Sequence, residues 1–220
     1  MPGKGIVIKK NFMVLYSGHK SSKHEAGTGF YISRRSINNL LDFAPVNERI
    51  CKIMVKLKHY NLALVSTHAP REEINEAAEE EFYSSLEKVC DTFPNSDTKR
   101  DGKESYLYPA CGGHSLHNET NDNGKWMINF ALGRNLAVTG TWYHHKDIHE
   151  VTSRSPDNKI FNQIDDTLVN RSHCTNVCDL RIKWGADIES DHLLVRAKIR
   201  LKIKKSEKAK ESEVKVWVYW

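Results

Sequence analysis

Short apolar runs, each interrupted by glycine, serine or a charged residue, fill the first third of the chain. Residues 5–8, 13–16 and 29–32 form runs of strand length. Residues 49–57 and 62–67 form longer runs that are partly β-branched, and the polar segment between them favours a turn. We therefore expect three short strands followed by a β-hairpin.

The clearest helix is predicted over residues 72–93. Apolar side chains recur there every three or four residues, with Glu and Lys between them, which is typical of a helix with one face in the core. Pro94 follows directly and should stop the helix. A second helix is predicted over residues 124–134.

Further strands are predicted over residues 136–143, 164–169 and 177–184. The last strand has the strongest pattern, because apolar and basic residues alternate strictly over residues 195–203. Such alternation indicates a half-buried strand with one basic face. Residues 204–220 are predicted to be a charged tail, although residues 216–220 are unusually apolar for a chain end.

The order of these elements favours an α/β (α+β) fold. Two mostly antiparallel sheets would pack face to face, with helices on the outside. Residues 95–123 do not fit this plan well, because they have almost no apolar period. Nearly thirty residues without regular structure are unusual inside a compact domain.

Composition narrows the class of protein. The 220 residues suit one domain, and 39% hydrophobic with 28% charged residues is compatible with a folded core. A net charge of +5 is compatible with a nucleic-acid partner such as DNA, and equally with an ordinary solvated surface. Five irregularly spaced cysteines favour reduced thiols, hence an intracellular protein of the nucleus or cytoplasm. We expect no signal peptide and no membrane span.

Polar residues at three predicted strand ends carry candidate chemistry. Asp191 and His192 precede the final strand, where a carboxylate can bind a divalent metal and an imidazole can transfer protons. Asp165 begins another strand and would be partly buried, so it needs a partner, and orienting an imidazole is one such use. His68 ends the predicted hairpin. Each has a structural alternative: a chance Ser-Asp-His match, a strand-end cap and a packed histidine.

Four short motifs, in this order along the chain, resemble the endonuclease/exonuclease/phosphatase superfamily. They are Thr67-His68-Ala69-Pro70, Arg154-Ser155-Pro156-Asp157, Asn162-Gln163-Ile164-Asp165 and Ser190-Asp191-His192. The closest similarity is to the endonuclease-like domains of non-LTR retrotransposons, including the craniofacial development protein 2-like group. Further stretches fit that group: Asn47-Glu48-Arg49-Ile50-Cys51, His114-Ser115-Leu116-His117-Asn118, Asn121-Asp122-Asn123-Gly124 and His145-Lys146-Asp147-Ile148-His149. The resemblance covers roughly residues 5–203.

This resemblance implies a four-layer sandwich and Mg²⁺-dependent cleavage of DNA phosphodiester bonds. It makes His192 the catalytic histidine and Asp165 the carboxylate that orients it. It places Asp191 on the metal side and Asn162 in a motif of the active site. It also places His68 near the scissile phosphate.

Two family features are not found in these 220 residues. The family opens with a strand that carries a catalytic Asn, followed by a metal-binding Glu, and the chain is expected to begin after both. The family also has a strand that ends in Gly-Asp-x-Asn, but no such motif stands between Ser96 and Glu104. We therefore expect an incomplete sandwich over residues 1–203, in which the principal metal ligand is absent.

Three hypotheses about function follow. The first is a Mg²⁺-dependent DNA endonuclease whose activity is weak or lost. The second is a non-catalytic nucleic-acid-binding or scaffold protein built on the same fold, with protein partners that the sequence does not identify. The third is an unrelated soluble domain, which requires every motif match to be a coincidence.

Overall fold

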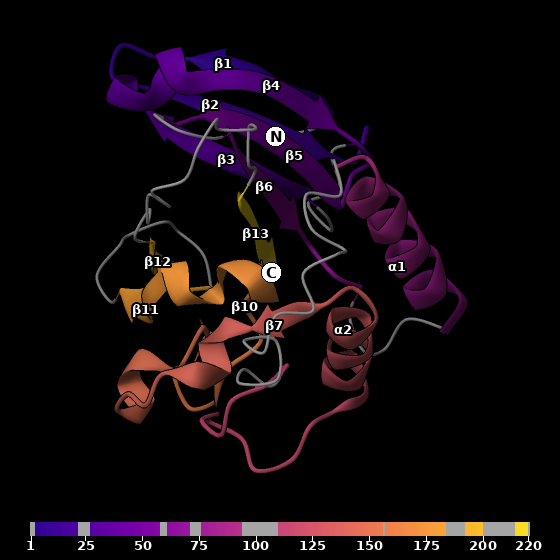
Figure 1. Cartoon of the computed structure of the whole chain (residues 1–220), viewed down its shortest axis with the longest axis vertical. Helices are drawn as coiled ribbons and strands as arrows, with labels where there is room; N and C mark the ends of the chain where they lie inside the picture. The colour runs from indigo at the N-terminus through magenta and orange to yellow at the C-terminus, as the bar shows by residue number, and fades with distance from the viewer. Residues whose placement is uncertain are drawn as a thin grey trace, which may run out of the picture. The chain divides into compact units, whose positions relative to one another are not determined.

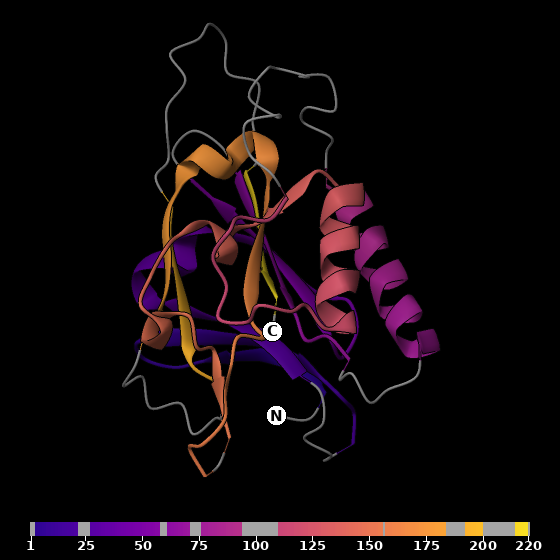
Figure 2. The same cartoon turned by 90° about the horizontal axis from the view of Figure 1, so that it is seen from below.

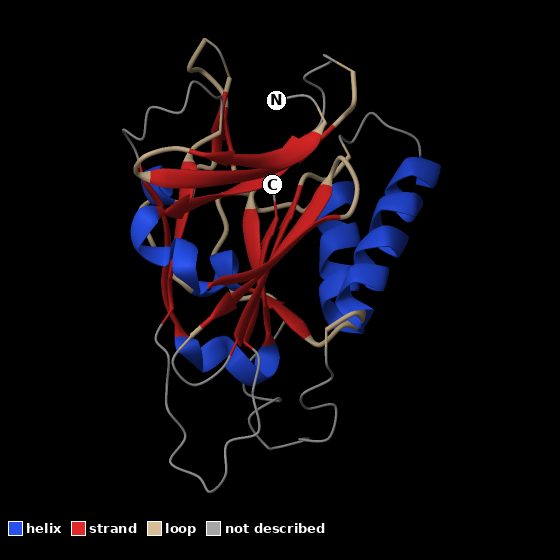
Figure 3. Ribbon diagram, turned by 90° about the horizontal axis from the view of Figure 1, so that it is seen from above, coloured by secondary structure: helices blue, strands red, loops and turns tan. Residues whose placement is uncertain are grey.

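The computed structural model describes residues 3–21, 27–57, 61–70, 76–93, 110–155, 157–183, 192–199 and 214–219. The chain divides into two compact units (Figure 1). Unit 1 comprises residues 1–98 together with residues 205–220, and unit 2 comprises residues 99–204. Strands predominate and helices are few (Figure 3), so the fold is mixed α/β with several small antiparallel sheets. The packing of two large sheets between helices stays a prediction.

Unit 1 contains a three-stranded antiparallel sheet of β1 (Lys4–Ile8), β2 (Phe12–Gly18) and β3 (Gly27–Ser33). These are the three strands that the short apolar runs predict. One face of the sheet is buried because Met13, Leu15 and Ile32 pack against Ile53. This cluster forms the core between this sheet and the next one.

The second sheet of unit 1 has the order β4 (Leu40–Pro45), β5 (Ile50–Lys56), β6 (Asn61–Thr67) and β13 (Val214–Tyr219). β5 and β6 form the predicted antiparallel hairpin. β4 was not predicted, and it follows a 3₁₀ helix, η1 (Arg34–Asn39).

β13 shows that the apolar end of the predicted charged tail forms a strand, for which the sequence pattern offered no explanation. Residues 214–219 pair in parallel with β6 over its whole length, from Val214 opposite Leu62 to Tyr219 opposite Thr67. The apolar character of the chain end is explained by this pairing, because a strand beside β6 needs strand-forming residues.

The predicted helix is α1 (Glu76–Asp91). Its periodic stripe is confirmed, because Phe82, Leu86 and Val89 are buried, as is Phe93 just beyond its end. At that end, the Lys52 Nζ of β5 donates to Thr92 Oγ1 at 2.9 Å and lies over the Phe93 ring. Residues 72–75 and Pro94 lie outside the described residues.

Unit 2 begins, among the described residues, with a loop over residues 110–121 that leads into α2 (Asp122–Gly133). The Asn121 side chain accepts the Gly124 backbone N–H at 2.9 Å, which caps the helix. The Asn121-Asp122-Asn123-Gly124 motif is therefore a helix start. α2 packs against β7 (Leu136–Val138), which pairs antiparallel with β10 (Asp166–Asn170).

One predicted strand is shorter than expected. The pattern predicted a strand over residues 136–143, but β7 ends at Val138 and a 3₁₀ helix, η3, spans Thr139–Trp142. The chain turns there because the Gly140 N–H donates to the Asp166 carboxylate at 2.9 Å. The Thr139 hydroxyl also donates to the Thr167 carbonyl at 2.8 Å.

Two hairpins complete unit 2. β11 (Val177–Lys183) pairs with β12 (Leu194–Ile199), which confirms these predicted strands where they are described. A shorter hairpin of β8 (Ser153–Arg154) and β9 (Phe161–Asn162) protrudes at the lower end of the view in Figure 2. Along the described part of the chain, no helix is long and apolar enough to cross a membrane.

Candidate functional site

Asp165 and His192 lie side by side in unit 2, although 27 residues separate them in the sequence. The His192 Nδ1 is 3.1 Å from Asp165 Oδ1 and 3.0 Å from Asp165 Oδ2. The Asp165 side chain is fully buried, whereas the His192 side chain is 27% exposed. The adjacency predicted from the sequence is confirmed, and the catalytic roles of the two residues stay predictions.

The contact limits which ring nitrogen of His192 can carry a proton. If Asp165 is ionised, its carboxylate can only accept a hydrogen bond, and Nδ1 is then the ring nitrogen that donates to it. The opposite nitrogen, Nε2, is then the one that can exchange a proton with water or a substrate. A buried carboxylate that orients an imidazole in this way is the arrangement of a general acid–base pair.

Thr152 joins the three segments that build this pair. Its backbone N–H donates to the Asn162 carbonyl at 2.8 Å, and its carbonyl accepts the Leu193 N–H at 2.7 Å. Its hydroxyl oxygen accepts the backbone N–H of Ile164 at 2.8 Å and of Asp165 at 3.0 Å. Thr152 is buried. It therefore holds the backbone on both sides of the Asp165–His192 contact.

Sequence reasoning did not identify Thr152. Its only local signal is its position two residues before the Arg154-Ser155-Pro156-Asp157 motif. An apolar cluster lies beside it, formed by Val151, Ile182 and Leu193. Val151 directly precedes Thr152 in the chain, and Leu193 directly follows His192. The apolar cluster therefore packs beside the hydrogen-bond network.

Asn162 contributes to the site through its backbone carbonyl, which accepts the Thr152 N–H. Ser153 lies opposite Asn162 in the β8–β9 ladder and opposite His192 in an isolated antiparallel bridge. Residues directly opposite one another in a ladder project to the same face, so Asn162, Ser153 and His192 share one face. The catalytic role predicted for the Asn162 side chain stays a prediction.

Two other family motifs have architectural roles. The Gln163 Oε1 accepts the Leu116 N–H at 2.9 Å, which ties the His114-Ser115-Leu116-His117-Asn118 loop to the site. Ser155 and Asp157 form the turn of the β8–β9 hairpin, where the Ile160 N–H donates to Ser155 Oγ at 3.0 Å. Pro156 lies outside the described residues.

His68 lies in unit 1, directly after β6. Its backbone N–H donates to the Arg49 carbonyl at 2.8 Å, and its Nδ1 is 3.1 Å from the Gly27 carbonyl. The Arg49 guanidinium donates to the carbonyls of His68 and Ala69, both at 3.3 Å. Arg49 thus holds the Thr67-His68-Ala69-Pro70 segment in place. The role of His68 near a scissile phosphate stays a prediction.

The predicted metal residue, Asp191, lies outside the described residues. Among the residues that are described, no three His, Cys, Asp or Glu side chains are grouped so that they could hold a metal ion. Magnesium usually needs one or two carboxylates together with substrate phosphates. The described side chains do not fit a magnesium site, and the Mg²⁺ expected from the resemblance remains an expectation.

A second imidazole–carboxylate pair occurs in unit 2. The His145 Nε2 is 3.1 Å from Asp179 Oδ1, while the Arg181 Nε is 2.7 Å from Asp179 Oδ2. Neither nitrogen has hydrogen-bond geometry to a partner within the described residues. Asp179 therefore lies between the Arg181 guanidinium and the His145 imidazole. Asp165, by contrast, meets one imidazole with both of its oxygens, which makes the Asp165–His192 pair the better candidate for proton transfer.

Asp166, the next residue after Asp165, is a buried carboxyl group of a different kind. Its Oδ1 accepts the Gly140 N–H at 2.9 Å and the Thr167 N–H at 2.6 Å. Burial raises the pKa of Asp166 to about 7, although both hydrogen bonds act to lower it, and the nearby Asp165 charge raises it further. Asp166 can thus change its protonation near neutral pH.

Comparison with known proteins agrees with this architecture. The chain is 25% identical over 210 residues to craniofacial development protein 2 of Bos taurus and 24% identical over the same length to that of Tragulus javanicus. Each alignment covers 92% of this chain, but the chain spans only 35% and 36% of the lengths of these relatives. No protein-family model matches the chain.

Solved structures identify the fold. The endonuclease domain of TRAS1, a telomere-specific non-LTR retrotransposon, superimposes with a TM-score of 0.56 at 14% identity, covering 86% of this chain and 81% of that domain. An endonuclease/exonuclease/phosphatase family protein from Leptotrichia buccalis gives 0.54 at 14% identity, covering 88% and 73%. The fold expected from the resemblance is confirmed, because the chain shares the fold of these two solved structures.

Two substitutions at Thr152 should distinguish the contribution of its hydroxyl group from that of its β-branched shape. Thr152→Val keeps the β-branched shape but leaves the buried Asp165 N–H without an acceptor, which costs ~1–3 kcal/mol. Thr152→Ser keeps the hydroxyl. In hydrogen-exchange measurements, we expect Thr152→Val to lose protection of the Ile164 and Asp165 amides, whereas Thr152→Ser retains it. Equal protection in the two variants would contradict the network.

The raised pKa of Asp166 predicts a pH dependence of stability. The folded state holds the Asp166 proton more tightly than the unfolded chain, so stability falls as pH rises from about 4 to about 7 and is level above. Asp166→Asn should therefore be increasingly more stable than wild type across this range, by at most ~4 kcal/mol. Melting temperatures at several pH values measure the difference.

Asp157→Asn provides a control of opposite sign. Hydrogen bonding by Ser155 lowers the pKa of the exposed Asp157, so this carboxylate favours the folded state above its ordinary pKa and loses that effect as pH falls. A melting-temperature difference for Asp166→Asn that is independent of pH would show that Asp166 is not the group that titrates.

Proposed function

We propose that this chain, which has the endonuclease/exonuclease/phosphatase fold, is a retrotransposon-derived endonuclease-like domain whose Asp165–His192 pair acts on phosphodiester bonds of DNA. The observation that carries the proposal is the two-oxygen contact between the buried Asp165 carboxylate and His192 Nδ1. The fold is shared with the endonuclease domain of TRAS1, and the sequence is 25% identical to craniofacial development protein 2 of Bos taurus, which supports the same ancestry.

His192 would transfer the proton in this reaction. Asp165 keeps the Nδ1 proton in place and stabilises the charge that the ring acquires, so Nε2 can take a proton from water or give one to a leaving oxygen. The Thr152 network keeps the two side chains in register while the substrate binds. Partial exposure of His192 gives a phosphodiester access to the ring.

We propose that hydrolysis by this chain is slow. General acid–base help alone contributes about 10²–10⁴-fold. In the family, a bound metal ion supplies the larger electrostatic stabilisation and activates water. The Gly-Asp-x-Asn motif, which positions nucleophile and phosphate in the family, does not occur between Ser96 and Glu104.

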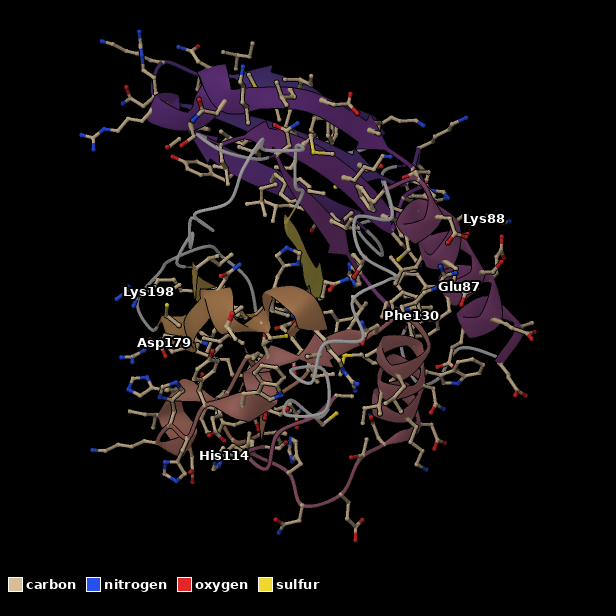
Figure 4. The ribbon with its side chains drawn as sticks, viewed as in Figure 1. Glu87, Lys88, His114, Phe130, Asp179 and Lys198 are labelled. Atoms are coloured by element: carbon tan, nitrogen blue, oxygen red, sulfur yellow. The ribbon has the colours of Figure 1, made fainter. Side chains whose placement is uncertain are left out.

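A second candidate function is nucleic-acid binding without catalysis. The alternation predicted for the last strand is present in β12, where Arg196 and Lys198 are exposed. Arg196 lies opposite Arg181 of β11, and like charges in opposite positions destabilise a sheet. Asp179 lies opposite Lys198, and both side chains project on the same side of the unit (Figure 4). This one carboxylate neutralises only part of the positive charge of the hairpin. A basic hairpin of this kind fits a phosphate backbone.

A plasmid-nicking assay with and without Mg²⁺ distinguishes the two functions. We expect slow nicking that His192→Ala and Asp165→Asn each reduce by about 10²-fold or more, because the first variant removes the imidazole and the second removes the carboxylate that orients it. His145→Ala is the matched control, since it disrupts the other imidazole–carboxylate pair and should leave the rate unchanged.

Other outcomes are equally informative. Rapid Mg²⁺-dependent nicking that His192→Ala abolishes would contradict the proposed impairment while supporting the role of the pair. Nicking that is insensitive to His192, or DNA binding without any nicking, would remove the pair from the mechanism and favour the non-catalytic function.

A further inference from the structure

The three-stranded sheet of unit 1 has an aromatic face turned away from its core. Side chains along β2 alternate between buried and half-buried positions. The buried ones, which include Met13 and Leu15, join the core cluster with Ile32. Because successive side chains of a strand point to opposite faces, the half-buried ones belong to the other face. They are Phe12, Val14 and Tyr16.

The register extends this face across the neighbouring strands. Tyr31 of β3 lies opposite Val14, while Gly5 and Gly29 lie opposite Tyr16 on either side. A Cβ atom on Gly5 would come within 2.9 Å of the Tyr16 hydroxyl oxygen, so the phenol ring lies over Gly5. The two glycines leave the ring without side chains beside it in either neighbouring strand.

Phe12 and Tyr31 form a stacked pair on this face. Their ring centroids are 4.9 Å apart and their planes are inclined by 28°. Tyr31 is nevertheless 67% exposed. An aromatic side chain stabilises a protein mainly when it is buried, so this pair contributes little to the core of unit 1. Phe12, Tyr16 and Tyr31 are called the aromatic platform below.

Cationic side chains gather at one end of the aromatic platform. Lys9 and Lys10 lie in the turn before Phe12, and Arg34 and Arg35 begin η1 directly after β3. The Arg34 backbone N–H donates to the Asn11 carbonyl at 2.9 Å, and its guanidinium donates to the Lys10 carbonyl at 2.7 Å. These bonds join the turn that carries Lys9 and Lys10 to the start of η1, next to Phe12.

The charge of this region is of one sign. The described residues 3–21 and 27–39 contain six Lys and Arg residues and no Asp or Glu, whereas the whole chain carries a net charge of +5. Among the described residues, an acidic group contacts this region at the other end, where His19 Nε2 is 3.6 Å from Glu48 Oε2. A ligand that complements aromatic rings beside cations has flat bases that stack on the rings and phosphates that meet the cations.

We propose that the aromatic platform binds single-stranded nucleic acid, with bases stacked on Tyr31 and its neighbours and phosphates held by Lys9, Lys10 and Arg34. Bases stack on exposed aromatic rings whatever their sequence, and basic side chains follow the backbone. A duplex keeps its bases stacked on each other, so it cannot use the platform. The aromatic platform belongs to unit 1, whereas the Asp165–His192 pair belongs to unit 2. Binding of nucleic acid by the platform does not depend on the proposed function.

Fluorescence anisotropy with the full chain tests this surface. The probes are labelled dT and U oligonucleotides of equal length and the corresponding duplex, with a chelator present so that no metal-dependent cleavage occurs. We expect the single strands to bind more tightly than the duplex. Tyr31→Ser should weaken single-strand binding by about five- to 100-fold, whereas Tyr31→Phe should bind like wild type.

Two controls separate stacking from charge and folding. Ile8→Ser changes a residue that is 68% exposed on the same sheet but opposite Met13, and it should leave binding unchanged. Replacing both Lys9 and Lys10 by Gln should reduce the slope of log affinity against log salt by about 1.4. His192→Ala should bind single strands as wild type does.

Several results would overturn the proposal. They are no binding of either single strand, equal affinity for the duplex, and loss of affinity in Ile8→Ser as large as in Tyr31→Ser. Self-association of the chain that Tyr31→Ser abolishes would also overturn it, because a second copy would then be the partner of the aromatic face. Binding of the dT or the U strand alone also supports the proposal.

Discussion

A carboxylate without exposure to water must be compensated, and in unit 2 that requirement is met by His192 beside Asp165. The contact joins the segment before β10 to the segment before β12, which are 27 residues apart. Thr152 bonds to both segments through its main chain and its hydroxyl, which supports the contact. The short β8–β9 hairpin begins directly after Thr152 and therefore helps to position this titratable pair.

The family motifs divide into residues that position the backbone and residues that could do chemistry. Gln163 holds a loop, Asn121 caps a helix and Ser155 closes a hairpin turn. Asp165 and His192 are the members that bring titratable groups together.

Local patterns predicted the strands and the helix well where one face is buried. The α1 stripe was confirmed, and the apolar run over residues 13–16 forms part of β2, because each element packs one side on a core. β13 could not be predicted, since its partner β6 lies about 150 residues earlier and a parallel pairing has no local signal. The early end of β7 depends on the Asp166 carboxylate. Thr152 was missed for the same reason, because its role lies in contacts between distant segments.

Heteronuclear NMR of the His192 imidazole tests the central claim most directly, with His192→Ala to assign the signals. If Asp165 orients the ring, the neutral imidazole carries its proton on Nδ1, and Nε2 is the nitrogen that titrates. Asp165→Asn should change this tautomer preference, because an amide can donate as well as accept. A proton on Nε2 in the wild-type chain, or a tautomer that is unaffected by Asp165→Asn, would contradict the claim that this pair is built for proton transfer.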